Sequence, residues 1–402
     1  MSRTRLGAQY AKLWSASSIS NLGDGVSIAA VPLLAAALTR DPVVFAGVTV
    51  ANRLPWLVFS LTAGGVADTV DRRKLVAFVD GGRFVVSALL GLGVLQGWVT
   101  IWHLYGAAFL LGTGEVFADI AAQVLMPAIV PRPELERANG RLFGAEIVTN
   151  QFAGPPLGSW LFAAVAASPF LFDGATFAVA ALLVSWIRVS PQSHIAPSGE
   201  RERPRIREGI MLLWRNRLIR TLALLGSAMN ALWTAGASIL GLYALEVLGI
   251  EEAAFGLLLT ASGVGYAAGS FTAARAIERL SRSRSLIAAA ASEVVMFVLF
   301  AAWPRPVVAG AGLAVFGYFS ALWDVTAVSL RQSIVPDELL GRVNGAYRFI
   351  QWGSMPIGAL LGGTIAAAFG LRWPWIVAAG VLTLALLFAI RPLASADVPA
   401  ST

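Results

Sequence analysis

Twelve hydrophobic stretches follow one another along nearly the whole chain, and polar segments separate them. An α-helix needs about 20 apolar residues to cross the hydrocarbon core of a bilayer, and each stretch has roughly that length. The pattern therefore predicts an all-α membrane protein with twelve transmembrane helices. The expected spans are residues 14–38, 43–66, 75–97, 103–126, 139–164, 168–188, 218–245, 253–275, 285–303, 306–329, 343–369 and 373–391.

The first six stretches and the last six resemble each other at a constant offset of 205 residues. The segments 129–131 (Ile-Val-Pro) and 137–140 (Arg-Ala-Asn-Gly) return as 334–336 (Ile-Val-Pro) and 342–345 (Arg-Val-Asn-Gly). A duplicated six-helix unit, with both copies running the same way, is typical of two-lobed secondary transporters. We therefore expect two six-helix, pseudo-symmetric lobes.

One long polar segment, residues 189–217, separates the two copies and is rich in Pro, Ser, Glu and Arg. It predicts an N-terminal lobe at 1–188 and a C-terminal lobe at 218–402, joined by a cytoplasmic linker. Within it, residues 205–215 are basic and amphipathic, which favours a short helix along the inner membrane surface. A linker with solvated charges explains the same residues.

Composition narrows the class of protein. Of 402 residues, 57% are hydrophobic and only 13% are charged, which excludes an ordinary soluble domain. Cysteine is absent, so disulfides and thiol chemistry are excluded, and no Gly-x-x-x-x-Gly-Lys-Ser/Thr phosphate loop occurs. His103 and His194 have no nearby residue with which to form a metal pair. We expect neither a metal nor another cofactor.

The net charge of +7 is distributed unevenly. Most of the 30 Lys and Arg residues lie at the two ends of the chain and in every second loop between the expected spans. The intervening loops hold only Arg40, Arg305 and Arg372. This asymmetry follows the positive-inside rule, and it predicts a multi-pass protein of the cytoplasmic membrane with both termini in the cytoplasm. It argues against nucleic acid as a partner.

Tryptophans gather near the ends of the expected spans, where an interfacial belt is the simplest explanation. These residues are Trp14, Trp160, Trp186, Trp303, Trp373 and Trp375.

The inner end of the second span carries Gly64 and Asp68, followed by Arg72 and Arg73. This segment resembles the loop signature of the major facilitator superfamily. The resemblance implies that the aspartate lies against the inner end of a helix in the other lobe, complements its N-terminal dipole and helps to close the inner side. Asp71 replaces the usual second glycine of the signature.

The fifth span contains Gly154, Pro155 and Gly158, followed by Ser159. This segment resembles the antiporter signature of proton-coupled drug exporters in the same superfamily, with Ser159 in place of the final glycine. The proline removes a backbone donor and predicts a bend of the helix. An ordinary proline kink, or close packing by glycines four residues apart, is the alternative interpretation.

Three further segments resemble one branch of the superfamily, the transmembrane secretion effectors, which contains the enterobactin exporter and the macrolide efflux proteins. They are residues 21–25 (Asn-Leu-Gly-Asp-Gly), 53–55 (Arg-Leu-Pro) and 208–216. The resemblance covers the whole chain and implies the major facilitator fold and export of siderophores, antibiotics or secondary metabolites. The arginine expected in the fourth span is missing, because residues 110–114 read Leu-Leu-Gly-Thr-Gly.

Charges inside the bilayer cost several kcal/mol unless they are paired or face water, so each is a functional candidate. Asp24 and Arg53 each lie about ten residues into adjacent antiparallel spans, so they are expected at similar depths. We hypothesise that Asp24 carries the coupling proton and that Arg53 adjusts its affinity; a static buried pair is the alternative. Asp80 and Arg83 are expected to pair locally.

Glu115 and Asp119 are four residues apart and share a helix face, and Asp324 is the repeat equivalent of Asp119. Glu115 is a further proton-coupling candidate, as is Glu146. Asp119 and Asp324 line the cavity or serve as structural groups near the inner side. Candidates for the wall of the substrate cavity are Asn21, Phe152, Trp233, Trp323 and Trp352.

Together these features predict a secondary active transporter, not an enzyme. The favoured activity is proton-coupled efflux of a hydrophobic or amphipathic small molecule, as in multidrug resistance, by a chain that functions as a monomer. A proton-coupled importer on the same fold is the first alternative. A membrane-embedded lipid transferase is the second, although the chain lacks an evident Asp-rich metal motif.

Overall fold

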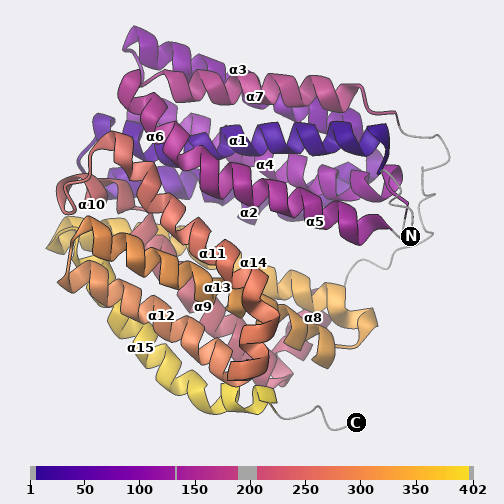
Figure 1. Ribbon diagram of the computed structural model, residues 1–402, viewed down its shortest axis with the longest axis vertical. Coiled ribbons are helices and arrows are strands. Elements are labelled where there is room, and N and C mark those ends of the chain that lie inside the picture. The colour runs from indigo at the N-terminus through magenta and orange to yellow at the C-terminus, as the bar shows by residue number, and fades with distance from the viewer. Residues whose placement is uncertain (1–5, 132–133, 189–205, 398–402) are drawn as a thin grey trace. The chain divides into compact units, whose positions relative to one another are not determined.

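The computed structural model describes residues 6–131, 134–188 and 206–397. In this part of the chain all regular secondary structure is helical (Figure 1). Among the described residues, ten helices are long and apolar enough to cross a membrane, and α9 with α10, which are bent by 45° relative to each other, make an eleventh if the pair is one span. The run formed by α5, η2 and α6 is helical from residue 135 to residue 164 and completes a set of twelve. The expected all-α, twelve-helix fold is therefore confirmed.

The helices of the first repeat are α1 (Gly7–Leu38), α2 (Pro42–Thr69), α3 (Arg72–Gln96), α4 (Ile101–Ile129), α5 (Leu135–Glu146), the π-helix η2 (Ile147–Ala153), α6 (Gly154–Ala164) and α7 (Ser168–Ser185). Those of the second part of the chain are α8 (Ile206–Arg215), α9 (Arg217–Ala237), α10 (Leu240–Glu246), α11 (Glu252–Leu280), α12 (Arg282–Ala302), α13 (Pro306–Ile334), α14 (Asp337–Phe369), α15 (Trp373–Ala394) and the short 3-10 helix η4 (Ser395–Asp397).

The chain divides into two compact units. Unit 1 comprises residues 1–39, 51–198 and 251–260, and unit 2 comprises residues 40–50, 199–250 and 261–402. Each unit therefore holds the beginning of one helix, α2 or α11, whose remainder belongs to the other unit. The lobe boundaries expected at residues 188 and 218 stay a prediction.

In unit 1, α7 packs against both α1 and α3, and α1 packs against α6. In unit 2, α15 packs against both α9 and α12, and α14 packs against α9 and α8. The start of α2 is held in unit 2 by an ion pair of 3.0 Å between Arg40 Nη1 and Glu246 Oε1. The helix expected within residues 205–215 is present as α8, and its Leu213 is fully buried.

The π-helix η2 has a local cause in the sequence. Pro155 and Pro156 lack the backbone N–H groups that would bond to the carbonyls four residues earlier. Immediately before them, the N–H of Gly154 donates to the carbonyl of Thr149, five residues back, which is the wider π spacing. In the second repeat, by contrast, α14 continues through its Pro356 as one helix.

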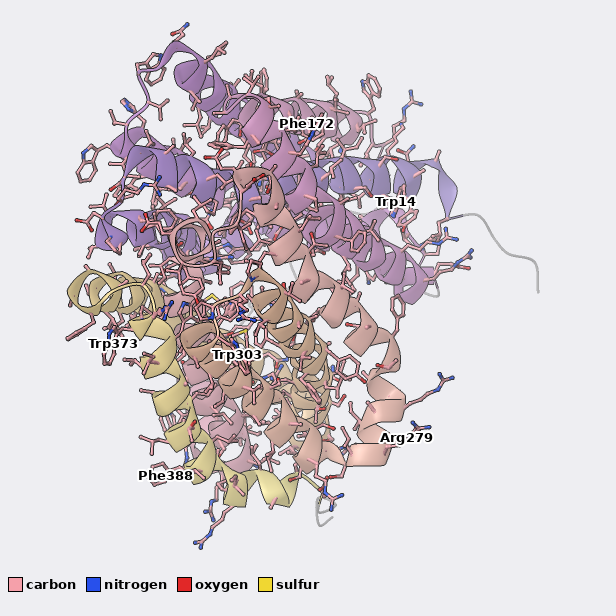
Figure 2. All side chains as sticks on the ribbon, turned by 60° about the vertical axis from the view of Figure 1, so that its left-hand side comes forward. Trp14, Phe172, Arg279, Trp303, Trp373 and Phe388 are labelled. Carbon is pink, nitrogen blue, oxygen red and sulfur yellow. The ribbon has the colours of Figure 1, made fainter. Side chains whose placement is uncertain are left out.

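Large apolar side chains point outward from the helices, as contact with lipid tails requires. Phe388 on α15 is 82% exposed, and Trp14, Trp303 and Trp373 are also exposed (Figure 2). Trp375 differs from the expectation of an interfacial belt. It is fully buried among Tyr243, Phe297 and Phe300, because Gly236 of α9 leaves space for its ring.

Candidate functional site

The glycines on either side of Asp24 bring α1 into direct contact with its neighbours. A Cβ atom at Gly23 would clash with the side chains of Asp173 and Thr176 on α7, and one at Gly25 would clash with the backbone of Asn150 in η2. Small residues allow such close backbone approach in membrane helices. Only glycine at positions 23 and 25 allows α1 to pack this closely against α7 and η2. Asp24 lies between these two glycines, at the point of closest contact.

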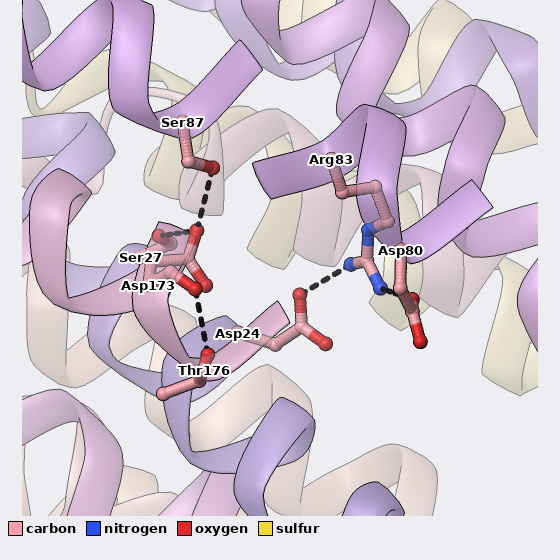
Figure 3. A network of polar contacts seen from close by, with 7 residues as sticks. All are labelled: Asp24, Ser27, Asp80, Arg83, Ser87, Asp173 and Thr176. Carbon is pink, nitrogen blue, oxygen red and sulfur yellow. Dashed lines mark hydrogen bonds and ion pairs between the residues drawn. The ribbon is translucent and has the colours of Figure 1, made fainter. Parts of the chain in front are cut away.

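The ion-pair partner of Asp24 is Arg83 on α3. Arg83 Nη2 lies 2.5 Å from Asp24 Oδ1, and Arg83 Nη1 lies 3.7 Å from Asp80 Oδ1 (Figure 3). The Arg83 side chain is 6% exposed and that of Asp24 is 29% exposed. The local pair of Asp80 with Arg83 was expected from the sequence. The pairing of Asp24 was not.

Arg53, the partner suggested by depth in the sequence, is exposed on α2. The described charges that act on Asp24 are those of Arg83, Asp173, Glu115 and Asp119. Matching the depth of two residues in adjacent spans gives no information on which face of each helix they occupy. The structure supplies that information and assigns the role of counter-ion to Arg83.

Arg83 also reaches Asp24 at the place where the resemblance expected an arginine on α4. A Cβ atom at Gly114, in the Leu-Leu-Gly-Thr-Gly segment of α4, would clash with Cγ and Cδ of Arg83. The aliphatic stem of Arg83 therefore fits against the α4 glycine, within the segment in which the resemblance expected an arginine. The carbon Cζ of Arg83 lies 3.9 Å from the ring centroid of Phe177, a cation–π contact with α7.

Asp173 on α7 is the functional candidate that the sequence reasoning missed. Its Oδ2 accepts hydrogen bonds from the hydroxyls of Ser27 (2.9 Å) and Ser87 (3.1 Å), as Figure 3 shows. The residue is 1% exposed, and its other oxygen, Oδ1, has no hydrogen-bond partner in the described part of the chain. The rule that marks charges within spans as functional candidates applies to Asp173 as well and would have found it.

Further acids lie near this cluster in unit 1. Glu115 and Asp119 on α4 are within electrostatic range of Asp24, and Glu146 at the end of α5 is within range of Glu115 and Asp119. Glu146 is exposed, whereas Glu115 is half-buried. Three of the proposed coupling residues, Asp24, Glu115 and Glu146, thus form one acidic series, whereas Arg53 forms no ion pair with an acid in the described part of the chain.

The basic loop before α3 is built around Asp71. Its carboxylate accepts from the backbone N–H of Arg73 (3.0 Å) and forms an ion pair of 2.8 Å with the Arg73 guanidinium. This side-chain hydrogen bond from Arg73 holds the pKa of the Asp71 carboxyl below its usual value. Arg73 Nη1 also donates to the carbonyl of Ile187 just after α7 (2.7 Å). The residue that departs from the family signature therefore caps α3.

The other members of the expected gate are only partly described. Gly64 and Asp68 lie within helix α2, but the side chain of Asp68 and the surroundings of Gly64 are outside the described part of the structure. Arg72 is half-buried at the first turn of α3. The family role of these residues as an inner gate stays a prediction.

Ser159, the departure in the antiporter-like segment, joins α6 to the start of α11 within unit 1. Its hydroxyl accepts a hydrogen bond of 2.6 Å from the backbone N–H of Gly256 and donates to the carbonyl of Pro155 (3.1 Å). Ser159 is fully buried. Gly256 lies near the start of α11, so this hydrogen bond ties the serine of α6 to the first turns of α11.

The neighbouring glycines of this segment pack against α1. A Cβ atom at Gly154 would clash with the backbone of Gly25, and one at Gly158 would clash with the backbone of Val26. Pro155 introduces the π-helical irregularity described above. The segment thus both packs closely against α1 and departs from regular α-helix.

The candidates for the substrate cavity have different surroundings. In unit 2, Trp233 stacks on Phe316 with ring centroids 4.8 Å apart, and Trp323 is buried beside Gly226. Trp352 is exposed, and the centroid of its ring lies 5.9 Å from Cζ of Arg348. In unit 1, Asn21 is half-buried and Phe152 is exposed, although the Phe152 carbonyl accepts from Thr260 (3.3 Å).

Comparison with known proteins identifies the family of the chain. The family model described as "Transmembrane secretion effector" matches residues 6–400. The chain is 26% identical over 393 residues to the multidrug efflux pump Tap of Mycobacterium tuberculosis (strain ATCC 25618 / H37Rv), covering 92% of this chain and 90% of that protein. It is 27% identical over 352 residues to the enterobactin exporter EntS of Salmonella typhi, covering 83% of this chain and 82% of that protein.

Solved structures share the fold at low sequence identity. A bacterial homologue of the iron transporter ferroportin, in an inward-facing state, aligns with a TM-score of 0.78 at 15% identity over 97% of this chain and 100% of that one. The nucleoside transporter NupG aligns with a TM-score of 0.74 at 11% identity over 96% of this chain and 99% of that one. The family and its members are transporters, so the alternative of a lipid transferase is set aside. The chain belongs to the transmembrane secretion effector family of major facilitator transporters.

Proposed function

We propose that this transporter exports a hydrophobic or amphipathic small molecule in exchange for protons, and that Asp24 is the residue that binds and releases the coupling proton. The observation that carries the proposal is the ion pair of Asp24 with Arg83 inside the helix bundle of unit 1. A buried ion pair contributes little net stability compared with apolar packing, so its presence within a membrane span favours a functional role.

The charge balance of the cluster supports proton binding. Asp24 and Asp80 contact one guanidinium, that of Arg83, and the acids Asp173, Glu115 and Asp119 lie within electrostatic range of it or of Asp24. When all of these carboxyl groups are ionised, the cluster has an excess of negative charge, which a proton would reduce. Asp24 is more exposed than Asp80 and Asp173, which are buried. Among these three acids it therefore has the readiest access to a proton from water.

Protonation of Asp24 would have a direct mechanical consequence. It removes the negative partner of Arg83 and so loosens the link between α1 and α3. Gly25, the next residue on α1, packs against η2 and Gly154, and the α6 helix that follows holds the start of α11 through Ser159. A displacement of α1 would thus be passed to α6 and α11 by contiguous contacts. We infer that the proton shifts the populations of the states of an alternating-access cycle along this route.

Export is favoured by the relatives, which are described as a multidrug efflux pump and an enterobactin exporter. The proposed substrate class follows from those descriptions and from the aromatic residues Trp233, Phe316 and Trp352 in unit 2. We further propose a location in the cytoplasmic membrane with both termini inside, since the basic residues cluster at one set of helix ends. One chain contains both repeats, and we propose that it works as a monomer.

The test is transport driven by a pH gradient in inverted membrane vesicles, with fluorescent amphipathic dyes as substrates. Wild-type vesicles with an acidic interior are expected to accumulate dye until an uncoupler is added. Asp24→Asn is expected to abolish that accumulation, whereas Glu278→Gln, which neutralises an exposed acid near the end of α11, is expected to retain it.

Each contrary result has a distinct meaning. Full gradient-driven accumulation by Asp24→Asn would refute Asp24 as the coupling site. Accumulation only when the gradient has the opposite orientation would indicate proton symport, and therefore import. Dye transport that ignores the gradient and the uncoupler would refute proton coupling altogether.

A further inference from the structure

Three buried polar atoms in the cluster lack a hydrogen-bond partner among the described residues, and one of them, Asp80 Oδ1, lies 3.7 Å from Arg83 Nη1. The other two, on Arg83 and Asp173, lie further apart. In the described part of the chain, Nε of Arg83 has no acceptor and Oδ1 of Asp173 has no donor. One is a cationic donor and the other is a carboxylate acceptor, and both belong to side chains that are at least nine-tenths buried. Buried polar groups are nearly always satisfied, so such a complementary pair in one cluster requires an explanation.

The two groups are within reach of each other. Ser87 lies four residues after Arg83 on α3, and its hydroxyl donates to Asp173 Oδ2 (3.1 Å). Asp173 is therefore about one helical turn along α3 from Arg83. The Arg83 guanidinium already contacts α7 at Phe177, one turn after Asp173, where Cζ lies 3.9 Å from the ring centroid. A rotation of the long arginine side chain toward Asp173 is therefore the movement that the exchange proposed below requires.

We propose that Asp173 is the alternate partner of Arg83: when Asp24 binds a proton, the guanidinium leaves Asp24 and pairs with Asp173. This inference rests on the proposed function of Asp24. With Asp24 ionised, Arg83 bonds to Asp24, and the Asp173 carboxylate relies on the hydroxyls of Ser27 and Ser87. With Asp24 neutral, the bond to Asp173 satisfies the two orphan atoms together.

The surrounding charges are compatible with such an exchange. Helix α7 packs against α1, which contributes Asp24, against α3, which contributes Asp80 and Arg83, and against α6, which has no charged residue. Glu115 and Asp119 on α4 act on Asp24 and so belong to the same titrating system. Asp80, 3.7 Å from Arg83 Nη1, stays in contact range as the guanidinium turns and would serve as its fixed anchor.

The direct test is an experimental structure of the full-length Asp24→Asn protein, whose asparagine imitates the protonated aspartate. We expect Arg83 Nε or a terminal nitrogen within hydrogen-bond distance of Asp173 Oδ1. An Arg83 guanidinium that stays beside residue 24 in that structure would overturn the proposal. This result does not depend on transport, so it decides the proposal even if proton coupling fails.

The second test is the pH profile of dye transport in Asp173→Asn, with Glu278→Gln as the control for loss of an acid elsewhere. Without the alternate partner, Arg83 remains on Asp24 and opposes its protonation. The midpoint of the profile is expected to move to lower pH by about 1 unit. A midpoint equal to that of wild type and the control would contradict the exchange. If wild-type transport itself ignores pH, the proposed function fails, and the structural test remains decisive for Arg83.

Discussion

Helices α1, α3 and α7 of unit 1 and helices α9, α12 and α15 of unit 2 occupy equivalent places in the two repeats, and they pack in the same pairs. Their chemistry differs. At the 205-residue offset, the positions of Asp24, Arg83 and Asp173 are taken by Met229, Ala288 and Ala378. Met229 and Ala378 are buried, so apolar residues fill in unit 2 the space that the charged cluster fills in unit 1.

This three-helix packing therefore does not need charged side chains at these positions. Unit 2 obtains the same architecture from an apolar core, and apolar packing of this kind is commonly as stable as a buried ion pair or more so. The charges of unit 1 therefore call for a reason other than stability. Unit 2 does have a buried acid on α12, Glu293, but no arginine stands at the position equivalent to Arg83.

The largest expected effect comes from a matched pair of arginine variants. Arg83→Gln leaves Asp24 and Asp80 without their cation, which should lower stability by about 3–5 kcal/mol and abolish gradient-driven transport. Arg53→Gln, on an exposed position of α2, should change neither by much. Thermal unfolding in detergent and dye uptake in vesicles check both variants. If Arg53→Gln lowered stability and transport more than Arg83→Gln, Arg53 would be the partner of Asp24, as the sequence suggested, and Arg83 would have no role in the mechanism.

A pair of glycine variants tests the close packing around Asp24. Gly23→Ala places a methyl group against Asp173 and Thr176, so we expect a loss of about 1–3 kcal/mol together with impaired transport. Gly81→Ala has open space around it and lies within α3, so it should be neutral or stabilising by up to about 1 kcal/mol. Equal melting temperatures for the two variants would show that α1 and α7 are not tightly packed here.

Ser159 of α6 differs from Thr364, which stands at the 205-residue offset on α14: Thr364 is exposed, and its hydroxyl donates within its own helix to the carbonyl of Leu361 (3.0 Å). Ser159→Ala removes the acceptor for the Gly256 N–H, and we expect a loss of about 1 kcal/mol in stability. Hydrogen exchange at the first turn of α11 should accelerate in this variant and stay unchanged at the first turn of α13. If exchange at the first turn of α11 stayed unchanged, the hydrogen bond between Ser159 and Gly256 would not stabilise that turn.

The smallest effect concerns two carboxylate caps outside the spans. Asp71 caps α3 from its own loop, whereas Asp397, near the chain end, accepts from the backbone N–H of Ser283 (3.1 Å) at the start of α12. Because Arg73 lowers the folded-state pKa of Asp71, its contribution is complete above the unfolded-state pKa and is lost as pH falls through the lower, folded-state value.

Asp71→Asn keeps a capping oxygen but loses the ion pair with Arg73, so it should cost about 0.5 kcal/mol at neutral pH and little in strong acid. Melting temperatures measured along an acid series check this expectation. A penalty that stays constant with pH would show that the charge of Asp71 makes no contribution to the cap.

Much of the fold could be predicted because hydrophobic length and repetition depend on local sequence alone. The twelve spans, the irregularity at Pro155 and Pro156, and the helix at residues 206–215 follow from composition and missing backbone donors. The local pair of Asp80 and Arg83 follows from helical spacing. These features need no knowledge of how the helices pack.

The partner of Asp24 could not be predicted in this way. Arg83 is 59 residues from Asp24 in the chain, and the contact depends on how α3 is rotated about its axis relative to α1 and on the space left by Gly114. The polar surroundings of Asp173 likewise come from serines on two other helices, Ser27 and Ser87. Hydropathy gives the depth of a residue in the membrane, but the choice among neighbours at that depth depends on tertiary packing.

The most direct test of the central claim is to measure proton movement itself. Purified protein in liposomes, with a pH-sensitive dye trapped inside, should show a proton flux opposite to the flux of substrate when substrate is added. If Asp24 binds and releases the coupling proton, this counterflow should occur in the wild type and be absent in Asp24→Asn at equal protein content. Counterflow of equal size in Asp24→Asn, or none in a wild-type protein that transports its substrate, would contradict the account.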